Sequence, residues 1–166
     1  MILKLLAQPR RVLALVSAIC IAMLIFGLYL QHVVGLEPCP MCIVQRYMLI
    51  LVAVVAAATA FAQRNRLLLV GSGLMALLAT LGAFVAARQS FLQWFPPSEA
   101  SCGRDLYGMI ETFPLKRVIP MIFKGSGDCT KIDWTFLSLS IANWSFLCFA
   151  AIALLGLLMV FRALKR

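Results

Sequence analysis

The chain has 166 residues, of which 63% are hydrophobic and only 13% are charged, and its formal net charge is +9 at pH 7. An ordinary soluble domain contains about 25% charged residues, so this composition excludes a single soluble core, and most of the apolar surface must face lipid. The cations form no contiguous stripe with interleaved aromatic residues, which argues against binding to nucleic acid.

Four long apolar segments follow one another along the chain. Apart from Arg46 in the second, they contain no Asp, Glu, Lys or Arg, and they cover residues 12–36, 43–62, 67–87 and 134–161. Each reaches the roughly 20 residues that a helix needs to cross a bilayer. The sequence therefore predicts an all-α membrane protein, a four-transmembrane-helix bundle in one integral membrane domain of residues 1–166. The expected spans are residues 12–34, 43–62, 67–88 and 138–161, with a short first outer loop at 35–42 and a long second outer loop at 89–137.

The distribution of charge predicts the orientation of this bundle. Eight cations without any acidic residue among them occupy the N-terminal segment, the second connection and the C-terminus: Lys4, Arg10, Arg11, Arg64, Arg66, Arg162, Lys165 and Arg166. All six acidic residues lie in or beside the other two connections. Because Lys and Arg are concentrated on the cytoplasmic side of membrane proteins, both termini are expected there, and the two outer loops on the opposite side.

The six cysteines divide between the spans and the outer loops. Cys20 and Cys148 lie within spans, where a cysteine usually packs as a small apolar side chain. The other four lie on the outer side, where disulfides persist: Cys39, Cys42, Cys102 and Cys129. Their natural pairing is Cys39 with Cys42 and Cys102 with Cys129.

Three interpretations of these four thiols remain open on spacing and topology. Two structural disulfides would brace the loops, and closing the loop between Cys102 and Cys129 would contribute about 3 kcal/mol; the small ring between Cys39 and Cys42 would contribute little. A zinc site is less favoured, because structural zinc sites usually contain two short-spaced cysteine pairs, and the only histidine, His32, is expected to be an interfacial polar group. The third interpretation, which the spacing favours, is a redox relay between the two pairs.

The motif Cys39-Pro-Met-Cys42 stands at the start of the second predicted helix. The helix dipole and the free backbone N–H groups at such a position favour a thiolate. Arg46 lies four residues after Cys42 and therefore on the same face of the helix. Its guanidinium would stabilise the Cys42 thiolate and an oxyanion on a bound electron acceptor. The alternative is that Arg46 only extends to the interface or to a lipid phosphate.

The long outer loop begins with helix and ends in turn residues. The third helix is expected to continue to Phe95 at the interface and to stop at Pro96 and Pro97. Residues 114–123 have the spacing of a short amphipathic helix on the membrane surface, or of a turn packed against the bundle. The run Gly-Ser-Gly-Asp before Cys129 is typical of a turn, and the loop is expected to move.

These features together resemble one known family. The motifs that carry the resemblance are Cys-Pro-Met-Cys followed by Arg46, then Gln93, Cys102, the run Gly-Ser-Gly-Asp-Cys ending at Cys129, and Asp-Trp-Thr-Phe-Leu at 133–137. With the four spans, they extend over essentially the whole chain and resemble the disulfide bond formation protein B (DsbB) family. The chain departs from many members of that family at Gln89, where they carry a histidine.

The resemblance implies a thiol:quinone oxidoreductase of the bacterial inner membrane, with both cysteine loops in the periplasm. Its implied partner is a periplasmic DsbA-like thiol oxidoreductase of thioredoxin fold, which would attack the Cys102–Cys129 disulfide and form a mixed disulfide with Cys102. Cys39 would exchange with this pair, and Cys42 would pass electrons to ubiquinone or menaquinone from the membrane pool. Arg46 would polarise a quinone oxygen. The resemblance implies no metal.

Two alternatives to this function stay open. The first is a scaffolding membrane protein in which both disulfides are passive. The second lies within the family: a member that serves one dedicated partner rather than a general oxidant, with partner choice set by contacts around residues 97–104.

Overall fold

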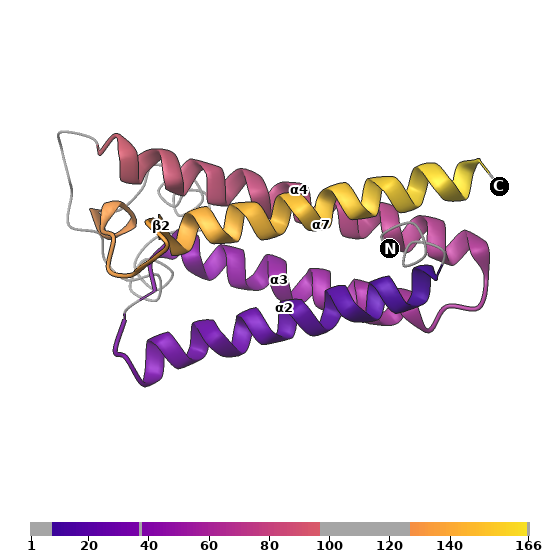
Figure 1. Cartoon of the computed structure of the whole chain (residues 1–166), viewed down its shortest axis with the longest axis horizontal. Helices are drawn as coiled ribbons and strands as arrows, with labels where there is room; N and C mark the ends of the chain where they lie inside the picture. Colours follow the sequence, from indigo (N-terminus) through magenta and orange to yellow (C-terminus); the bar gives the residue numbers. More distant parts are fainter. Residues whose placement is uncertain (1–7, 37, 97–126, 166) are drawn as a thin grey trace, which may run out of the picture.

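The computed structural model describes residues 8–36, 38–96 and 127–165. Four long helices account for most of this part of the chain: α2 (Pro9–His32), α3 (Pro40–Ala60), α4 (Asn65–Trp94) and α7 (Ile141–Leu164). They run side by side in one elongated bundle (Figure 1). All four are long and apolar enough to cross a membrane, which confirms the predicted all-α, four-helix membrane bundle.

The helix boundaries follow from local sequence. Pro9 and Pro40 occupy the first turns of α2 and α3, where the missing backbone N–H is not needed. Helix α4 continues to Trp94, just before Pro96, as expected. The side chain of Ser140 caps α7 by accepting a hydrogen bond from the backbone N–H of Asn143 at 3.4 Å. The amphipathic piece expected at 114–123 lies outside the described residues.

The core of the bundle lies where α4 meets α3 and α7, and where α2 meets α3. Leu13, Val52, Met75 and Phe149, one from each helix, are fully buried in this core. Many large apolar side chains on the outer faces are exposed instead. Because lipid is as apolar as these side chains, that exposure suits a bundle that lies in a bilayer.

A short hairpin precedes α7. Strand β1 (Thr135–Phe136) pairs antiparallel with β2 (Leu139–Ser140), and the two residues between them, Leu137 and Ser138, both have positive φ, at 51° and 64°. Positive φ at both central residues is typical of the tight turns that join antiparallel strands. The sequence did not predict this hairpin, since strands of two residues carry no readable alternation of apolar and polar side chains.

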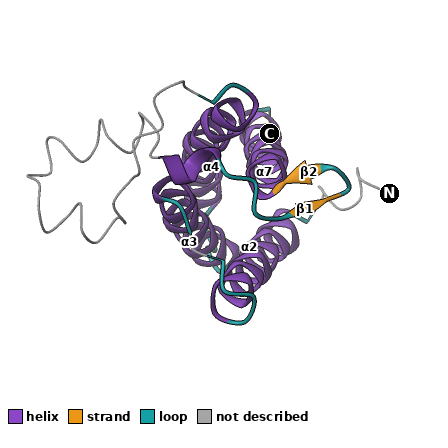
Figure 2. Ribbon diagram, turned by 90° about the vertical axis from the view of Figure 1, so that its left-hand side faces the viewer, coloured by secondary structure: helices purple, strands orange, loops and turns teal. Residues whose placement is uncertain are grey.

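The two ends of the bundle differ in what they hold. One end of the bundle contains the start of α2, the turn between α3 and α4, and the end of α7 (Figure 1). The hairpin, the short 3-10 helix η1 (Gly127–Thr130) and the start of α3 lie at the other end, which Figure 2 views end-on. The first end carries Arg and Lys without acidic residues, and the second is where the cysteine motif begins α3. The candidate site is at this second end.

Candidate active site

Cys39 and Cys42 form one compact pair at the start of α3. Cys39 is the N-cap residue, and its sulfur accepts a hydrogen bond from the backbone N–H of Cys42 at 3.3 Å. The two Sγ atoms lie 2.8 Å apart and share a hydrogen bond. Pro40 and Met41, both buried, hold the turn between them. The pair therefore has the geometry in which a disulfide closes and opens with little movement of the backbone.

Cys129 joins this pair from the far side of the long connection. It lies in η1, is fully buried, and packs in one cluster with Cys39, Met41 and Leu92. Its hydrogen bond with Cys39, the hydrogen bond between Cys39 and Cys42, and burial together raise the pKa of the Cys39 thiol. The structure thus brings together three of the four cysteines predicted for the site; Cys102 lies outside the described residues.

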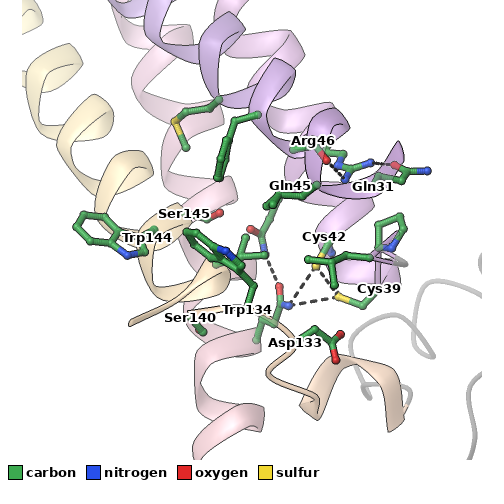
Figure 3. A pocket seen from close by; sticks show the side chains of 18 of the residues that line it. Gln31, Cys39, Cys42, Gln45, Arg46, Asp133, Trp134, Ser140, Trp144 and Ser145 are labelled. Carbon is green, nitrogen blue, oxygen red and sulfur yellow. Dashed lines mark hydrogen bonds between the residues drawn. The ribbon is translucent and has the colours of Figure 1, made fainter. Parts of the chain in front are cut away.

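The sulfur atoms are also contacted by an amide. Gln89 of α4 directs its Nε2 at both of them, 3.3 Å from Cys39 Sγ and 3.2 Å from Cys42 Sγ. Gln45 of α3 donates from its own Nε2 to Gln89 Oε1 at 2.7 Å. Figure 3 draws the hydrogen bonds that lead from Gln45 to the two cysteines. An N–H donor at Cys42, in the first turn of α3, favours negative charge on that sulfur, as the dipole of α3 also does.

Arg46 lies one turn beyond Cys42, as its spacing predicted, and its guanidinium reaches across to α2. There it donates to the backbone oxygen of Gly27 at 3.0 Å and to Oε1 of Gln31. It has no acidic partner among the described residues. A guanidinium carries five N–H donors, so these two bonds leave donors for a ligand in the adjoining cavity.

A cavity of about 760 Å³ begins at the thiol pair and extends into the bundle. Cys39, Cys42 and Arg46 line its end, and Ile19 and Met23 line it at the middle of α2. Its walls come from all four helices and from the segment before the hairpin (Figure 3). Mostly apolar walls with a few converging polar groups are typical of a site for an organic ligand.

Aromatic rings cover this cavity from α2 across to α7. Trp134 contacts Phe26 edge-on, with ring centroids 5.7 Å apart, and stacks on Phe136 at 6.1 Å. Phe136 in turn contacts Trp144 of α7 at 6.1 Å, and the Trp144 indole N–H donates to the backbone oxygen of Phe136 at 3.1 Å. These rings link the hairpin segment to both α2 and α7. Elsewhere, α2 packs mainly against α3, and α7 packs mainly against α4.

The remaining cysteines and the histidine lie apart from the thiol pair. Cys20 is fully buried in the bundle core, as expected for a packing residue. Cys148, which the sequence assigned to packing as well, lines the deeper part of the cavity. His32 ends α2 and is exposed. Within the described ranges, no group of three or more His, Cys, Asp or Glu side chains is arranged to hold a metal ion.

Several residues of the site were not predicted from the sequence. Gln31 and Gln45 received no role, Gln93 and Trp134 entered only as parts of the family pattern, and Gln89 only as a departure from it. The available signal was the polarity of Gln45, since a polar side chain inside an apolar span usually faces the bundle interior and marks a functional site. Its partner Gln89 lies 44 residues away in the chain, so no local pattern could identify the contact.

Comparison with known proteins agrees with these features. The family model described as "Disulfide bond formation protein DsbB" matches residues 9–159. Relatives named disulfide bond formation protein B include one from Polaromonas sp. strain JS666, 76% identical over 160 residues, which cover 96% of this chain and 95% of the relative. Another, from Polaromonas naphthalenivorans, is 68% identical over 166 residues, covering 100% and 99%. A third, from Azoarcus sp. strain BH72, is 53% identical over 158 residues, covering 94% and 95%. The chain, a membrane protein with a cysteine pair at the head of its second span, therefore belongs to the DsbB family of disulfide bond formation proteins.

Proposed function

We propose that this membrane oxidoreductase is a thiol:quinone oxidoreductase, which reoxidises a periplasmic DsbA-like donor and passes the electrons through two cysteine pairs to a membrane quinone. The observation that carries the proposal is that Cys129 packs against Cys39 and Cys42, and that these two cysteines line the apolar cavity. A passive disulfide brace needs neither a third sulfur at the pair nor a ligand cavity beside it.

Electron entry follows ordinary thiol–disulfide exchange. The partner's thiolate attacks Cys102 of the Cys102–Cys129 disulfide, which forms a mixed disulfide and leaves the electron pair on Cys129. Cys129 then attacks Cys39 of the Cys39–Cys42 disulfide, so a Cys39–Cys129 bond forms and the Cys39–Cys42 bond breaks. The electron pair of the broken bond stays on Cys42. The contact between Cys39 and Cys129 supports this order.

The cycle closes when the partner's second thiol attacks the mixed disulfide. The partner leaves oxidised, and Cys102 becomes a thiolate that attacks Cys129 and restores the Cys102–Cys129 disulfide. Cys39 is released as a thiol beside Cys42. The two electrons and two protons that came from the partner's dithiol are then held by Cys39 and Cys42, which must lose them to become a disulfide again.

The cavity fits a quinone as the acceptor. Its volume and apolar walls suit a flat apolar ring with a hydrocarbon tail, and Arg46, with N–H donors to spare, would bind a carbonyl oxygen. When bound, a quinone supplies an acceptor for two electrons and two protons. The rings of Phe26 and Trp134 contact each other and line the cavity, so they bound the space in which the acceptor would be oriented. Ubiquinone and menaquinone present similar rings to these residues.

The test is the absorbance of the oxidised quinone over time, with purified protein in detergent and a reduced DsbA-type partner as donor. We expect catalytic loss of the quinone band with the unmodified chain and none with Cys42→Ser, because Cys42 holds the electron pair that leaves the protein. Cys20→Ala, which removes a buried thiol of the core, is the matched control and keeps turnover. Normal turnover in Cys42→Ser would refute the assigned roles.

The same assay distinguishes the proposed enzyme from a scaffolding protein with passive disulfides. If the unmodified chain consumes no quinone, a small dithiol replaces the protein donor. Consumption with the small dithiol alone would mean that this family member serves a different, dedicated partner. No consumption with either donor, together with disulfides that resist mild reductants, would favour passive structural disulfides.

A further inference from the structure

Two glutamine side chains line the cavity beside the thiol pair. Gln45 and Gln89 are each only 4% exposed, and they come from different helices, α3 and α4. An amide buried inside a membrane bundle without hydrogen-bond partners costs several kcal/mol. Here the two amides satisfy each other in part, and the remaining donor end of Gln89 is directed at sulfur.

The orientation of the Gln89 amide depends on Gln45. An amide has a donor end and an acceptor end of nearly the same shape, so its hydrogen-bond partners decide which end faces which neighbour. The Nε2 of Gln45 donates a hydrogen bond to Oε1 of Gln89 at 2.7 Å. The other end of that amide, Nε2 of Gln89, therefore lies within 3.3 Å of both sulfur atoms. With no hydrogen bond from Gln45, the amide of Gln89 is free to turn its oxygen toward the sulfurs.

We propose that Gln45 is a positioning residue, which holds the amide of Gln89 with its N–H groups toward Cys39 and Cys42. When the Cys39–Cys42 bond breaks under attack on Cys39, the electron pair moves to Cys42 Sγ, and a fixed donor already faces that sulfur. This inference deepens the proposed function and rests on it. Gln45 itself has no hydrogen bond to either sulfur and acts through Gln89.

The two glutamine amides differ from a histidine at the same place because they do not titrate. Neither amide gains or loses a proton in the physiological range, whereas a histidine at position 89 would change its charge between about pH 5 and pH 8. The donor at Cys42 is therefore present at every working pH. The pH dependence of Cys42 reactivity should then reflect the thiols of Cys39, Cys42 and Cys129 rather than the titration of residue 89.

The test measures the pH dependence of Cys42 alkylation in the full-length, reduced protein, by mass spectrometry of the modified peptide. Gln45→Met and Gln89→Met keep the approximate shape of the side chain and remove the amide. Loss of a hydrogen bond to a charged acceptor should move the alkylation midpoint of Cys42 up by about one pH unit, a roughly tenfold slower reaction below the midpoint. The double variant should shift no further than either single one, because both substitutions remove the same contact.

Gln93→Met is the matched control. Gln93 lies one turn further along α4 and lines the same cavity, but it accepts from Ser140 Oγ at 2.6 Å and donates to the backbone oxygen of Lys131 at 3.4 Å. We expect an unchanged alkylation midpoint for Cys42. An equal shift in Gln93→Met, or shifts that add in the double variant, would mean that the amides act only through packing.

A second substitution keeps the inference testable if Gln45→Met does not fold. Gln45→Leu also removes the donor to Gln89 Oε1 and introduces no charge near the sulfurs. The midpoint should then rise about as far as in Gln89→Met, and an unshifted midpoint would overturn the proposal. Alkylation requires neither quinone nor partner, so a failure of quinone reduction would refute the proposed function without changing this result.

Discussion

At the scale of single residues, Arg46 offers the sharpest test of how the cavity binds its ligand. Its guanidinium is held by Gly27 and Gln31 of α2 while it lines the cavity beside Cys42. Under the proposed function, Arg46→Ala should raise the apparent KM for quinone about tenfold or more, because it would remove a charge-assisted hydrogen bond, and should leave the KM for the protein partner nearly unchanged. Steady-state kinetics with each substrate varied in turn measures both values.

Arg88→Ala is the control for Arg46→Ala. Arg88 is a cation of α4 near the same end of the bundle, but it does not line the cavity. We expect its removal to leave the quinone KM as it is. If Arg46→Ala also left the quinone KM unchanged, the guanidinium would serve only to join α3 to α2 or to reach the interface.

The sequence could locate some of these residues and not others, for a physical reason. The position of Arg46 relative to Cys42 follows from helix periodicity alone, so a single segment was enough. The link from Gln45 to Gln89 joins two helices, and the contact of Cys39 with Cys129 joins segments about 90 residues apart. Such contacts depend on how helices pack, which a single sequence does not encode in any local pattern.

At the scale of elements, the joint between α4 and α7 depends on small residues. A Cβ added to Gly82 would lie 2.5 Å from the ring of Phe149, and that ring is fully buried. Gly82→Ala should therefore lower the stability of the bundle by about 1–3 kcal/mol, as overpacking of a core does. The measurement is the thermal unfolding midpoint in detergent.

Gly73→Ala, nine residues earlier in the same helix, is the matched control. An added Cβ there would lie 3.9 Å from Val160, an ordinary contact. Alanine also favours a helix over glycine, so we expect an unchanged or slightly higher midpoint. Equal losses in both variants would show that helix α4 tolerates no added methyl group and that Phe149 is not the cause.

Elements themselves were predictable to different degrees. Long charge-poor segments identify the four helices because a bilayer demands length and apolarity from any spanning helix. The hairpin at 135–140 escaped prediction because its turn uses Leu137 and Ser138 at positive φ, where Gly or Asn is usual. The hairpin is held at the cavity by ring contacts among Trp134, Phe136 and Trp144, which a local sequence pattern does not reveal.

At the scale of the whole molecule, the bundle has one basic end and one thiol end. The charge distribution predicts that the basic end is cytoplasmic. A fluorescent protein fused after residue 166 should therefore fold and fluoresce in living cells, and alkaline phosphatase at the same position should stay inactive. Phosphatase fused after residue 96, at the end of the third span, should be active. The reverse pattern would place the thiol pair in the reducing compartment and contradict the proposed direction of electron flow.

The depth of the cavity has a consequence for kinetics. It extends from the thiol pair to Ile19 and Met23, in the middle of α2, so under the proposed function its ligand arrives from the lipid phase. Occupancy is then governed by the number of quinone molecules per lipid, not by their number per volume of buffer. Adding detergent or lipid at fixed amounts of protein and quinone should slow turnover by surface dilution. The capacity of the cell to make disulfides would thus vary with the composition of its membrane.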